Sequence, residues 1–451
     1  MNTLAQQAEH SKSILIIGIG QSGLSCARFL VGQGYTVAIM DTREQPPALN
    51  VLQTELPEVL VKTGGLDQKL MQQADMIVLS PGIDPRLPEI VAAKNANIEI
   101  VGDVELFARN ANAPIVAITG SNGKSTVTTL LAEMAEESGM AVKVGGNLGT
   151  PALDLITEPA PNFYIVELSS FQLETVRSLN AFVATVLNVS PDHLDRYDTE
   201  QDYIKAKATI YNGSGVMVLN RDDDHVMQLS LRGRNQIHFS LETCDGVDFG
   251  VVEQEGIRYL AEGQQTLLAI DDLLIKGKHN VSNALAALAL GSAMGLAMPA
   301  MTATLKHYPG LPHRCSLVAE KDNIQWFNDS KATNVGACIA AIEGLADRGK
   351  ILLIAGGVGK DQDFSELTAV LDKHVETVIL LGQDAALISA VIPSNVSVHN
   401  AKSMDEAVKL ANEIAVAGQT VLLSPACASF DMFSGYAERG EVFERAVRFL
   451  L

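Results

Sequence analysis

A glycine-rich loop that ends in one lysine and two hydroxyl residues is the strongest chemical signal in this sequence. It reads Thr119-Gly120-Ser121-Asn122-Gly123-Lys124-Ser125-Thr126, follows the apolar run 115–118 and opens a helical stretch. In a phosphate-binding loop of this kind, Lys124 neutralises the β- and γ-phosphates of ATP and Ser125 binds Mg²⁺. The loop departs from the full consensus because Ile118 stands where the first glycine belongs. We predict an ATP site here, with an ordinary glycine-rich turn as the alternative.

A magnesium ion at such a loop needs oxygen ligands beyond the phosphates. Glu167 lies near the carboxyl end of the strand candidate 163–168, and ligands collect at that edge of a parallel sheet. His193 follows the next strand candidate. A lone loop histidine is more often a hydrogen-bonding residue, but its place beside an ATP loop favours a role in the site. Lys205 and Lys207 lie on the following helix, where the residues alone assign them no role.

A second glycine loop, Gly18-Ile19-Gly20-Gln21-Ser22-Gly23, follows the apolar run 14–17 and precedes a helix. Its glycines would let the backbone approach a diphosphate, and the helix N-terminus would point free N–H groups at it. Asp41, at the end of the next strand, is placed to accept a hydrogen bond from a ribose hydroxyl. The pattern favours NAD, but any nucleotide diphosphate could use the same surface. The structural alternative is that these glycines only permit tight packing of strand against helix.

Short apolar runs alternate with helical stretches along the chain, which predicts an α/β protein with mainly parallel sheets. Turn-rich stretches near 110–114 and 307–312 divide this alternation into three units. We predict a Rossmann-like N-terminal domain, a P-loop NTPase-like central domain and a Rossmann-like C-terminal domain. Their predicted bounds are 1–102, 103–310 and 311–451.

Two stretches of the central unit differ from simple alternation. Shorter, alternating segments between 236 and 270 predict an antiparallel edge on its sheet. Residues 284–305 carry no charge and are long enough to span a bilayer, but their alanines, glycines and proline favour a buried helix. In the third unit the strand candidates are 324–328, 351–354, 377–381, 397–399 and 420–423.

Composition excludes several classes of protein. The 451 residues include 33 Lys and Arg against 53 Asp and Glu, a net charge of −20 that repels nucleic acids and anionic lipids. The cysteines form no metal or disulfide pattern, and the N-terminus lacks the pattern of a signal peptide. We expect a cytoplasmic protein that binds no nucleic acid and has no stable membrane insertion.

Four motifs together resemble the ATP-dependent Mur ligases of peptidoglycan synthesis, whose relatives include folylpolyglutamate synthases. They are TGSNGKST at 119–126, ELSSFQLE at 167–174, NVSPDHLDRY at 188–197 and KGKHNVSNALAA at 276–287. In the third unit, NDSKATN at 328–334 and SPACASFD at 424–431 resemble the D-glutamate-adding members of that family. The resemblance covers the whole chain, and the motifs are most specific as a set in this order.

The resemblance implies a ligase that uses ATP and Mg²⁺ at two sites, with Mn²⁺ able to replace it. ATP would phosphorylate the terminal carboxylate of UDP-N-acetylmuramoyl-L-alanine, the amine of D-glutamate would attack the acyl phosphate, and a tetrahedral intermediate would expel phosphate. Because one anion must react with another, Mg²⁺ and cationic side chains must screen the approach. The first domain would then hold UDP and not NAD. We expect a monomer whose partners are these small molecules.

The resemblance also implies roles for individual residues. Lys124, His193 and Lys207 would be catalytic. The UDP-substrate site would comprise Gly20, Gln21, Ser22, Asp41, Thr42, Arg43, Gly82 and Asn147. The ATP site would comprise Gly123, Lys124, Ser125, Thr126, Asn280, Asn283, Arg314 and Asp329, with His279 on the adenine side. The D-glutamate site would comprise Lys331, Thr333, Lys360, Ser429, Phe430 and Tyr436, and the metal ligands would be Ser125, Glu167, His193 and Lys207.

Lys207 matches a lysine that reacts with CO₂ in this family, and its carbamate would act as a carboxylate-like metal ligand. Lys205 is close enough in sequence to leave that choice open.

Three alternatives to the ligase also stay open. Another Mur ligase or a folylpolyglutamate synthase-like ligase would share the first four motifs. A nicotinamide-dependent dehydrogenase would leave the loop at 119–126, Glu167 and His193 without a purpose, and a regulatory ATP switch would form no amide.

Overall fold

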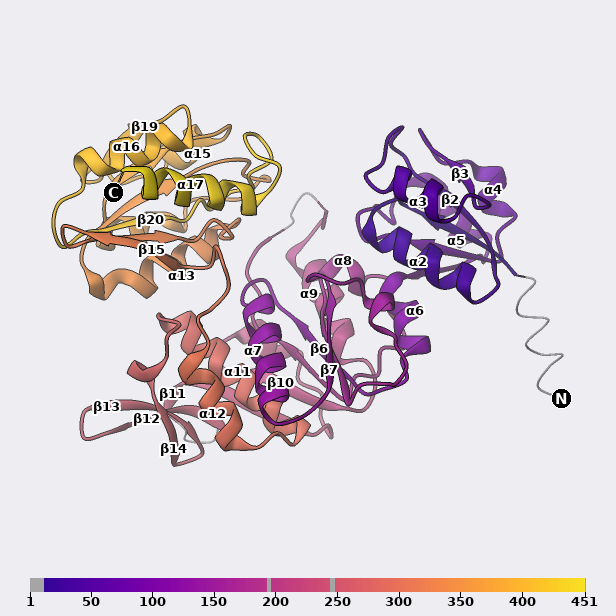
Figure 1. Ribbon diagram of the computed structural model, residues 1–451, viewed down its shortest axis with the longest axis horizontal. Helices are drawn as coiled ribbons and strands as arrows, with labels where there is room; N and C mark the ends of the chain where they lie inside the picture. Colours follow the sequence, from indigo (N-terminus) through magenta and orange to yellow (C-terminus); the bar gives the residue numbers. More distant parts are fainter. Residues whose placement is uncertain (1–11, 193–195, 244–247, 451) are drawn as a thin grey trace.

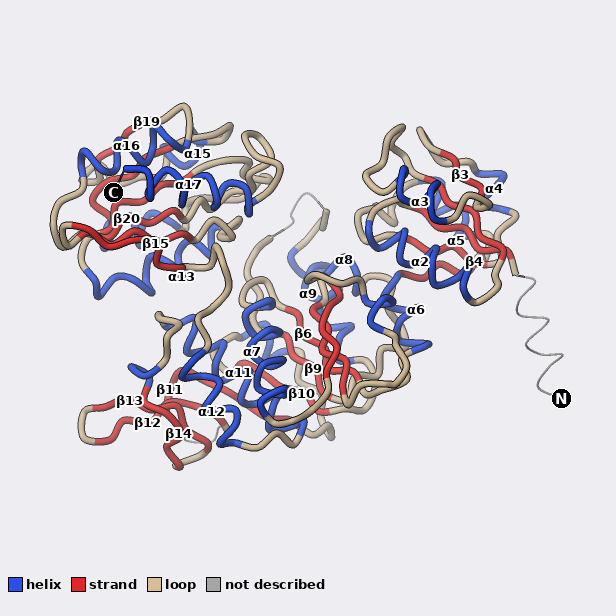
Figure 2. Tube along the Cα trace, in the orientation of Figure 1, coloured by secondary structure: helices blue, strands red, loops and turns tan. Residues whose placement is uncertain are grey.

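The structure is a computed structural model that describes residues 12–192, 196–243 and 248–450. Figure 1 shows three lobes in chain order, each built around one sheet, and Figure 2 shows the helices packed against these sheets. The predicted α/β class with three mainly parallel sheets is therefore confirmed. The limits predicted for the three domains stay a prediction.

The first sheet places the glycine loop 18–23 at the carboxyl edge of β1. In the described residues its strands are all parallel, in the order β3-β2-β1-β4-β5. A Cβ on Gly23 would lie 1.9 Å from the carbonyl oxygen of Gly18, so helix α2 can pack onto the loop only with glycine there. The bounds are β1 (Ser13–Ile17), α2 (Gln21–Gly32), β2 (Thr36–Met40), α3 (Leu49–Glu55), β3 (Leu60–Lys62), α4 (Gln68–Gln72), β4 (Met76–Leu79), α5 (Pro88–Asn95) and β5 (Glu99–Gly102).

The second sheet has a parallel core, in the order β11-β10-β9-β6-β8-β7 along the described residues. The ATP loop, Glu167 and Asn188 follow the carboxyl ends of its central strands, which brings them to one edge. The bounds are α6 (Asp103–Asn110), β6 (Ile115–Thr119), α7 (Lys124–Glu137), β7 (Val142–Gly146), the 3₁₀ helix η1 (Ala152–Leu155), β8 (Phe163–Glu167), α8 (Ser170–Leu173), β9 (Val183–Val186), α9 (Glu200–Ala208), β10 (Val216–Asn220), α10 (Asp224–Gln228) and β11 (Gln236–Thr243).

An antiparallel edge extends this sheet through β12 (Phe249–Gln254), β13 (Ile257–Glu262) and β14 (Gln265–Ala269). The prediction for 236–270 is confirmed for these three strands, whereas β11 pairs in parallel with both β10 and β12. Helices α11 (Lys278–Met294) and α12 (Met298–His307) divide the uncharged stretch 284–305. Ala284 and Leu290 are fully buried, as predicted, and no helix of the described residues is long and apolar enough to cross a membrane.

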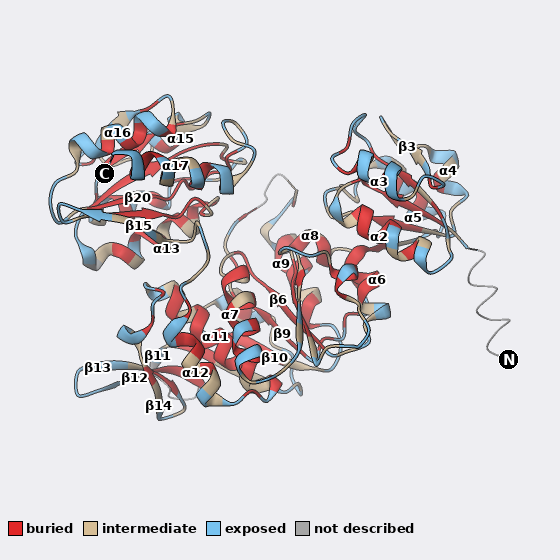
Figure 3. Ribbon diagram, in the orientation of Figure 1, coloured by how far each residue is buried: buried red, intermediate tan, exposed pale blue. Residues whose placement is uncertain are grey.

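The third sheet has the order β15-β16-β20-β17-β18-β19 in the described residues, with β15 antiparallel to β16 and the other pairs parallel. The bounds are β15 (Ser316–Lys321), β16 (Ile324–Asn328), α13 (Val335–Leu345), β17 (Ile351–Ala355), α14 (Leu367–His374), β18 (Val375–Leu380), α15 (Ala385–Ser389), β19 (Ser397–Asn400), α16 (Met404–Ile414), β20 (Thr420–Leu423) and α17 (Tyr436–Leu450). Figure 3 shows that buried residues lie along the strands within each lobe. The second and third sheets have separate apolar cores.

Candidate active site

The ATP loop connects β6 to α7, and its backbone carbonyls accept hydrogen bonds from the lysine of the loop. Gly123 has φ +82°, and a Cβ there would lie 2.4 Å from the side-chain oxygen of Asn283. Lys124 begins α7, and its Nζ donates to the carbonyl oxygens of Gly120 and Ser121, each 2.9 Å away. Burial lowers the pKa of Lys124. Phosphate oxygens entering this loop would compete with the two carbonyls for the lysine.

Lys207 on α9 reaches the same loop. Its side chain is buried, its Nζ donates to the Gly120 carbonyl 2.9 Å away, and the nitrogen lies 4.5 Å from the centre of the Tyr203 ring. Burial, followed by the nearby charge of Lys124, holds the pKa of Lys207 well below its usual value. Lys205 has a side chain 75% exposed and pairs with a carboxylate of its own helix. The structure therefore separates the two lysines that the sequence left open.

Glu167 ends β8 and is buried beside the ATP loop. Its Oε1 accepts a hydrogen bond from Asn147 Nδ2, 2.7 Å away, and its Oε2 is buried without a hydrogen-bond partner among the described residues. A buried carboxylate oxygen with no donor is a position that a cation would satisfy. The described ranges hold no group of three or more His, Cys, Asp and Glu side chains that could bind a metal, so ligands such as Ser125 would have to contribute. The predicted ligand His193 lies outside the described residues.

The third domain reaches the ATP loop through Arg314. The Arg314 Nη2 donates to the Ser125 hydroxyl, 2.8 Å away. Asp329, which follows β16, accepts from the Ser424 hydroxyl at 2.8 Å and from the Cys315 N–H at 3.1 Å. Burial raises the pKa of Asp329 to about 7. The carboxyl edges of the second and third sheets therefore face each other across the loop.

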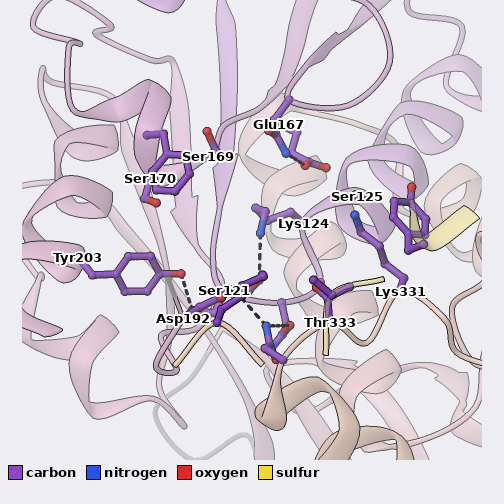
Figure 4. Close-up of a pocket in the computed structure, with 18 of the residues that line it drawn as sticks. Ser121, Lys124, Ser125, Glu167, Ser169, Ser170, Asp192, Tyr203, Lys331 and Thr333 are labelled. Carbon is purple, nitrogen blue, oxygen red and sulfur yellow. Dashed lines mark hydrogen bonds and ion pairs between the residues drawn. The ribbon is translucent and has the colours of Figure 1, made fainter. Parts of the chain in front are cut away.

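Most of the predicted residues meet in one cleft of about 360 Å³, which we call the central cleft. Figure 4 shows Lys124, Glu167 and Lys331 around it, on separate elements of the chain. The Lys331 Nζ lies 3.8 Å from the centre of the Tyr436 ring, and burial lowers the pKa of this lysine to about 8. The predicted residues that line the cleft are Gly123, Lys124, Ser125, Asn147, Glu167, Lys207, Arg314, Lys331, Thr333, Lys360, Ser429, Phe430 and Tyr436.

Two further pockets adjoin the central cleft. The first, of about 260 Å³, shares Gly123 and Arg314 with it and is called here the α11 pocket; it is also lined by Thr126, His279, Asn280, Asn283 and Asp329. The second, of about 580 Å³, shares Asn147 and Pro81 with the cleft and is called here the first-sheet pocket; it is also lined by Gly20, Gln21, Ser22, Thr42, Arg43 and Gly82. The predicted ATP and UDP residues therefore flank the central cleft on two sides.

Asp41 differs from its expected geometry, because it does not line the first-sheet pocket. Its side chain is fully buried, and its two oxygens accept from the backbone N–H of Ile19, 2.7 Å away, and from the Arg43 guanidinium at 2.7 and 2.9 Å. The Arg43 bonds, together with backbone N–H groups, outweigh burial and lower the pKa of Asp41. In this structure Asp41 orients Arg43 at the pocket and does not present a free carboxylate to a ribose.

The sequence prediction omitted several residues of the site. Ser121, Asp192, Tyr203 and Asn334 line the central cleft, and Gln172 lines the first-sheet pocket. The Ser121 and Tyr203 hydroxyls are 3.0 Å apart, and the Asn334 Nδ2 donates to Asp192 Oδ2 at 3.2 Å. Four of the five lie within the quoted motifs, which was the available signal, but residue type alone did not separate them from their neighbours; Tyr203 lies outside every quoted motif.

Comparison with known proteins identifies the family over nearly the whole chain. Three family models match: the MurD-like N-terminal domain of Mur ligases over residues 12–102, the Mur ligase middle domain over 118–291 and the Mur ligase glutamate ligase domain over 313–427. A protein of Nitrosococcus oceani named UDP-N-acetylmuramoylalanine--D-glutamate ligase is 49% identical over 99% of this chain and 98% of its own. A Pseudomonas aeruginosa protein of the same name is 49% identical over 96% of this chain and 97% of its own.

Solved structures show the same fold at low sequence identity. UDP-N-acetylmuramate-alanine ligase from Thermotoga maritima has a TM-score of 0.62 at 17% identity, covering 98% of this chain and 100% of that one. The MurF ligase of Thermotoga maritima in complex with ADP has a TM-score of 0.63 at 16% identity, and the match covers 98% of this chain and 96% of that one. With three matching domain models in order and relatives near half identity, this chain belongs to the Mur ligase family.

Proposed function

We propose that the protein joins D-glutamate to UDP-N-acetylmuramoyl-L-alanine, with hydrolysis of ATP to ADP and phosphate, in the synthesis of peptidoglycan precursors. The observation that carries this proposal is the meeting of the ATP loop, Glu167, Lys207 and the lysines of the third domain in one cleft. Relatives near 49% identity carry the name of this activity. A nicotinamide-dependent dehydrogenase has no support from the family, and it would leave this cleft without a purpose.

The reaction has two steps, and the cations of the central cleft suit both. A carboxylate oxygen of the acceptor attacks the γ-phosphorus of ATP, which forms an acyl phosphate and releases ADP. The D-glutamate amine then attacks the acyl carbon, loses a proton and expels phosphate through a tetrahedral intermediate. Lys124 is placed to neutralise the phosphates, and Arg314 is within reach of the same loop. Because every reactant is an anion, these fixed charges lower the barrier in both steps.

Glu167 and Ser125 are the described residues that would hold Mg²⁺, and the buried Oε2 of Glu167 fits that use. The ion would screen the phosphate charge when bound, and Mn²⁺ has the same preference for oxygen ligands. A second metal would be held by His193 and the carbamate of Lys207, the ligands that the family resemblance implies. An amine reacts with CO₂ only in its neutral form, and the lowered pKa of buried Lys207 favours that form.

The two flanking pockets take the remaining parts of the substrates. The α11 pocket would hold the adenosine part of ATP, next to Asn280 and Asn283. The first-sheet pocket would hold the UDP part of the acceptor, where Arg43 offers a charged fork to phosphate and α2 offers its N-terminus. The acceptor's alanyl carboxylate would then extend past Asn147, which lines both this pocket and the central cleft.

D-Glutamate enters with two carboxylates, which explains lysines on the third-domain side of the cleft. Lys331 and Lys360 would bind these carboxylates, with Thr333 and Ser429 as hydrogen-bonding partners. The Lys360 Nζ lies 3.8 Å from Asp192 Oδ1, a contact that a substrate carboxylate would replace. Phe430 is 75% exposed and Tyr436 packs against Lys331, so these two aromatics would close over the substrate.

The test is a phosphate-release assay with UDP-N-acetylmuramoyl-L-alanine and a panel of amino acids. We expect ADP and phosphate only when both the acceptor and D-glutamate are present, with a product heavier by one glutamyl unit in mass spectrometry. Full turnover with L-lysine or meso-diaminopimelate would assign a different member of the family, and ATP binding without any amide would favour a regulatory switch. Light scattering and cell fractionation would test the monomer and the cytoplasm that we propose for this reaction.

A further inference from the structure

Asp103 is a buried carboxyl that lies behind the first-sheet pocket. It is the first residue of α6, where the chain passes from the first sheet to the second, and it is 3% exposed. Its Oδ2 accepts a hydrogen bond from Gln172 Nε2, 3.3 Å away, whereas its Oδ1 has no partner of ordinary geometry among the described residues. The Ser22 side chain also interacts with this carboxyl. A buried polar atom without a partner calls for an explanation.

Both neighbours of Asp103 line the first-sheet pocket, and they come from different domains. Ser22 lies in the first turn of α2, beside the first sheet, and Gln172 lies on α8, beside the second. The Gln172 amide is oriented from both ends, because its Oε1 accepts from the Ser169 N–H at 3.1 Å while its Nε2 donates to Asp103. One carboxyl therefore connects the two walls of a single pocket.

The backbone beside Asp103 is held tightly against Thr175, in the segment that follows α8. A Cβ on Gly102 would lie 2.1 Å from the Thr175 hydroxyl oxygen, so only glycine permits this approach. The carboxyl is consequently fixed in place by packing of the residue before it. A group fixed in this way can set the distance and the angle between Ser22 and Gln172.

We propose that Asp103 is a positioning residue that aligns Ser22 and Gln172 for the UDP-linked acceptor across the boundary of two domains. This inference rests on the proposed function, because it assigns the first-sheet pocket to that acceptor. Burial raises the pKa of Asp103, with the hydrogen bond from Gln172 acting in the opposite direction. A neutral side chain of the same shape should therefore do the same work.

The first experiment compares Asp103→Ala and Asp103→Asn with the wild type in the ligase assay. We expect Asp103→Ala to raise the KM for the acceptor at least about fivefold, because one buried hydrogen bond is lost, with kcat and the KM for ATP within about twofold. Asp103→Asn should restore the KM to within about twofold, since its amide can accept from Gln172 and donate to Ser22. Asp103→Leu replaces Asp103→Ala if the latter does not fold, as judged by its melting temperature.

Asp154→Ala is the matched control. Asp154 lies on the 3₁₀ helix η1, between strands β7 and β8 of the second sheet, and accepts from the Ser25 hydroxyl of α2, 2.6 Å away, so it connects the same two domains. It does not line the first-sheet pocket. If Asp103 acted only by holding the domains together, Asp154→Ala would raise the KM for the acceptor equally, and that outcome would overturn the proposal.

A double-mutant cycle with Gln172→Ala gives the second readout. If Asp103 acts through Gln172, adding Asp103→Ala to Gln172→Ala should change the KM for the acceptor by less than about twofold. Fully additive effects, or an unchanged KM in Asp103→Ala, would contradict the positioning role. Calorimetric titration of the wild type with the acceptor separates the two hypotheses, because a wild type that binds no UDP-linked acceptor would overturn the proposed function, and the inference with it.

Discussion

The guanidinium of Arg314 donates a hydrogen bond to the hydroxyl of Ser125, 2.8 Å away, although 189 residues separate them in the chain. Ser125 is the loop hydroxyl that we expect to bind Mg²⁺, and Arg314 is the first charged residue that the third domain brings to the loop. Mg²⁺ on the Ser125 oxygen and the Arg314 guanidinium beside it would repel each other, because both are positively charged. Binding of the nucleotide with its metal should therefore release Arg314 from Ser125 and leave the guanidinium free for the phosphates.

Replacement of Arg314 tests this exchange. We expect Arg314→Ala to lower kcat/KM for ATP at least about 100-fold, because a fixed positive charge beside the transferred phosphoryl group is lost. Binding of the UDP-linked acceptor should stay within about twofold. Arg348→Ala is the control, since Arg348 is exposed in the same domain, stacks on Phe327 and lines neither the central cleft nor the α11 pocket. Equal losses in both variants would show that the effect is not local to the loop.

Replacement of Lys207 tests the carbamate. Lys207→Ala should lower kcat at least about 100-fold, and short carboxylic acids should restore part of the rate by entering the space that the side chain leaves. Lys205→Ala removes an exposed lysine two residues away and should change kcat by less than about twofold. Activity that no carboxylic acid restores at any concentration would count against a carboxylate-like role, even if the loss itself were large.

The dependence of stability on pH should report on His279. Its ring packs against Gly344, where a Cβ would lie 3.1 Å from the ring, and burial lowers the pKa of His279 to about 4. Between about pH 6.5 and pH 4 the unfolded chain therefore binds a proton that the folded chain does not. As the pH is lowered through this window, the free energy of unfolding should decrease, by up to about 3 kcal/mol from this residue.

The comparison is with His279→Gln, which has no proton to gain in this window. The stability advantage of the wild type over this variant, measured by denaturant unfolding at several pH values, should shrink as the pH falls from 6.5 to 4. An advantage that stayed constant would mean that His279 is protonated equally in both states. Because acidification affects many carboxylates in both proteins alike, only the difference between the two curves is informative.

The contact between the first and second domains should depend on Arg196 more than on Arg86. The Arg196 Nη2 donates to Glu174 at 2.7 Å and to the Ile83 carbonyl at 3.1 Å, and its side chain is only 11% exposed. Arg196→Ala removes the donor from a carboxylate that is only 14% exposed and from a carbonyl, and should destabilise the protein by about 2 kcal/mol. Ile83 lines the first-sheet pocket, so the KM for the acceptor should rise as well.

Arg86→Ala is the matched variant for this contact, since Arg86 also crosses to the second domain, at Asp198. Both side chains of that pair are largely exposed, so its loss should change the free energy of unfolding by less than about 1 kcal/mol. Denaturant unfolding of both variants gives the comparison. If Arg86→Ala were as harmful as Arg196→Ala, burial would not be what gives the Arg196 contact its strength.

Much of the fold follows from local patterns in the sequence. The strands β16 and β20 have the predicted bounds, because most of their residues are apolar and both strands lie inside the sheet and not at its edge. The prediction missed β7, whose five residues include Lys143 and two glycines, and it missed β15, an edge strand that ends in the charged pair Glu320 and Lys321. Strands at the edge of a sheet need fewer apolar residues, so the pattern that reveals the central strands is weak there.

The site was predictable only where a motif identified residues one by one. Spacing alone placed Lys124 and Glu167 beside each other, because neighbouring parallel strands end at the same edge. It could not choose between Lys205 and Lys207, since only the packing around α9 makes one of them buried. Nor could it detect Asp103, whose importance comes from two neighbours that are distant in sequence, Ser22 and Gln172.

The separate apolar cores behind the central cleft have a consequence for inhibition. The central and third domains supply most of the walls of the cleft, each is packed around its own apolar core, and the Arg314 contact is one of the bonds that join them. A small molecule wedged between those walls would block catalysis by holding them at the wrong separation. Such a compound would not need to imitate a nucleotide, an amino acid or a sugar. It would therefore not have to compete with the high cellular concentration of ATP.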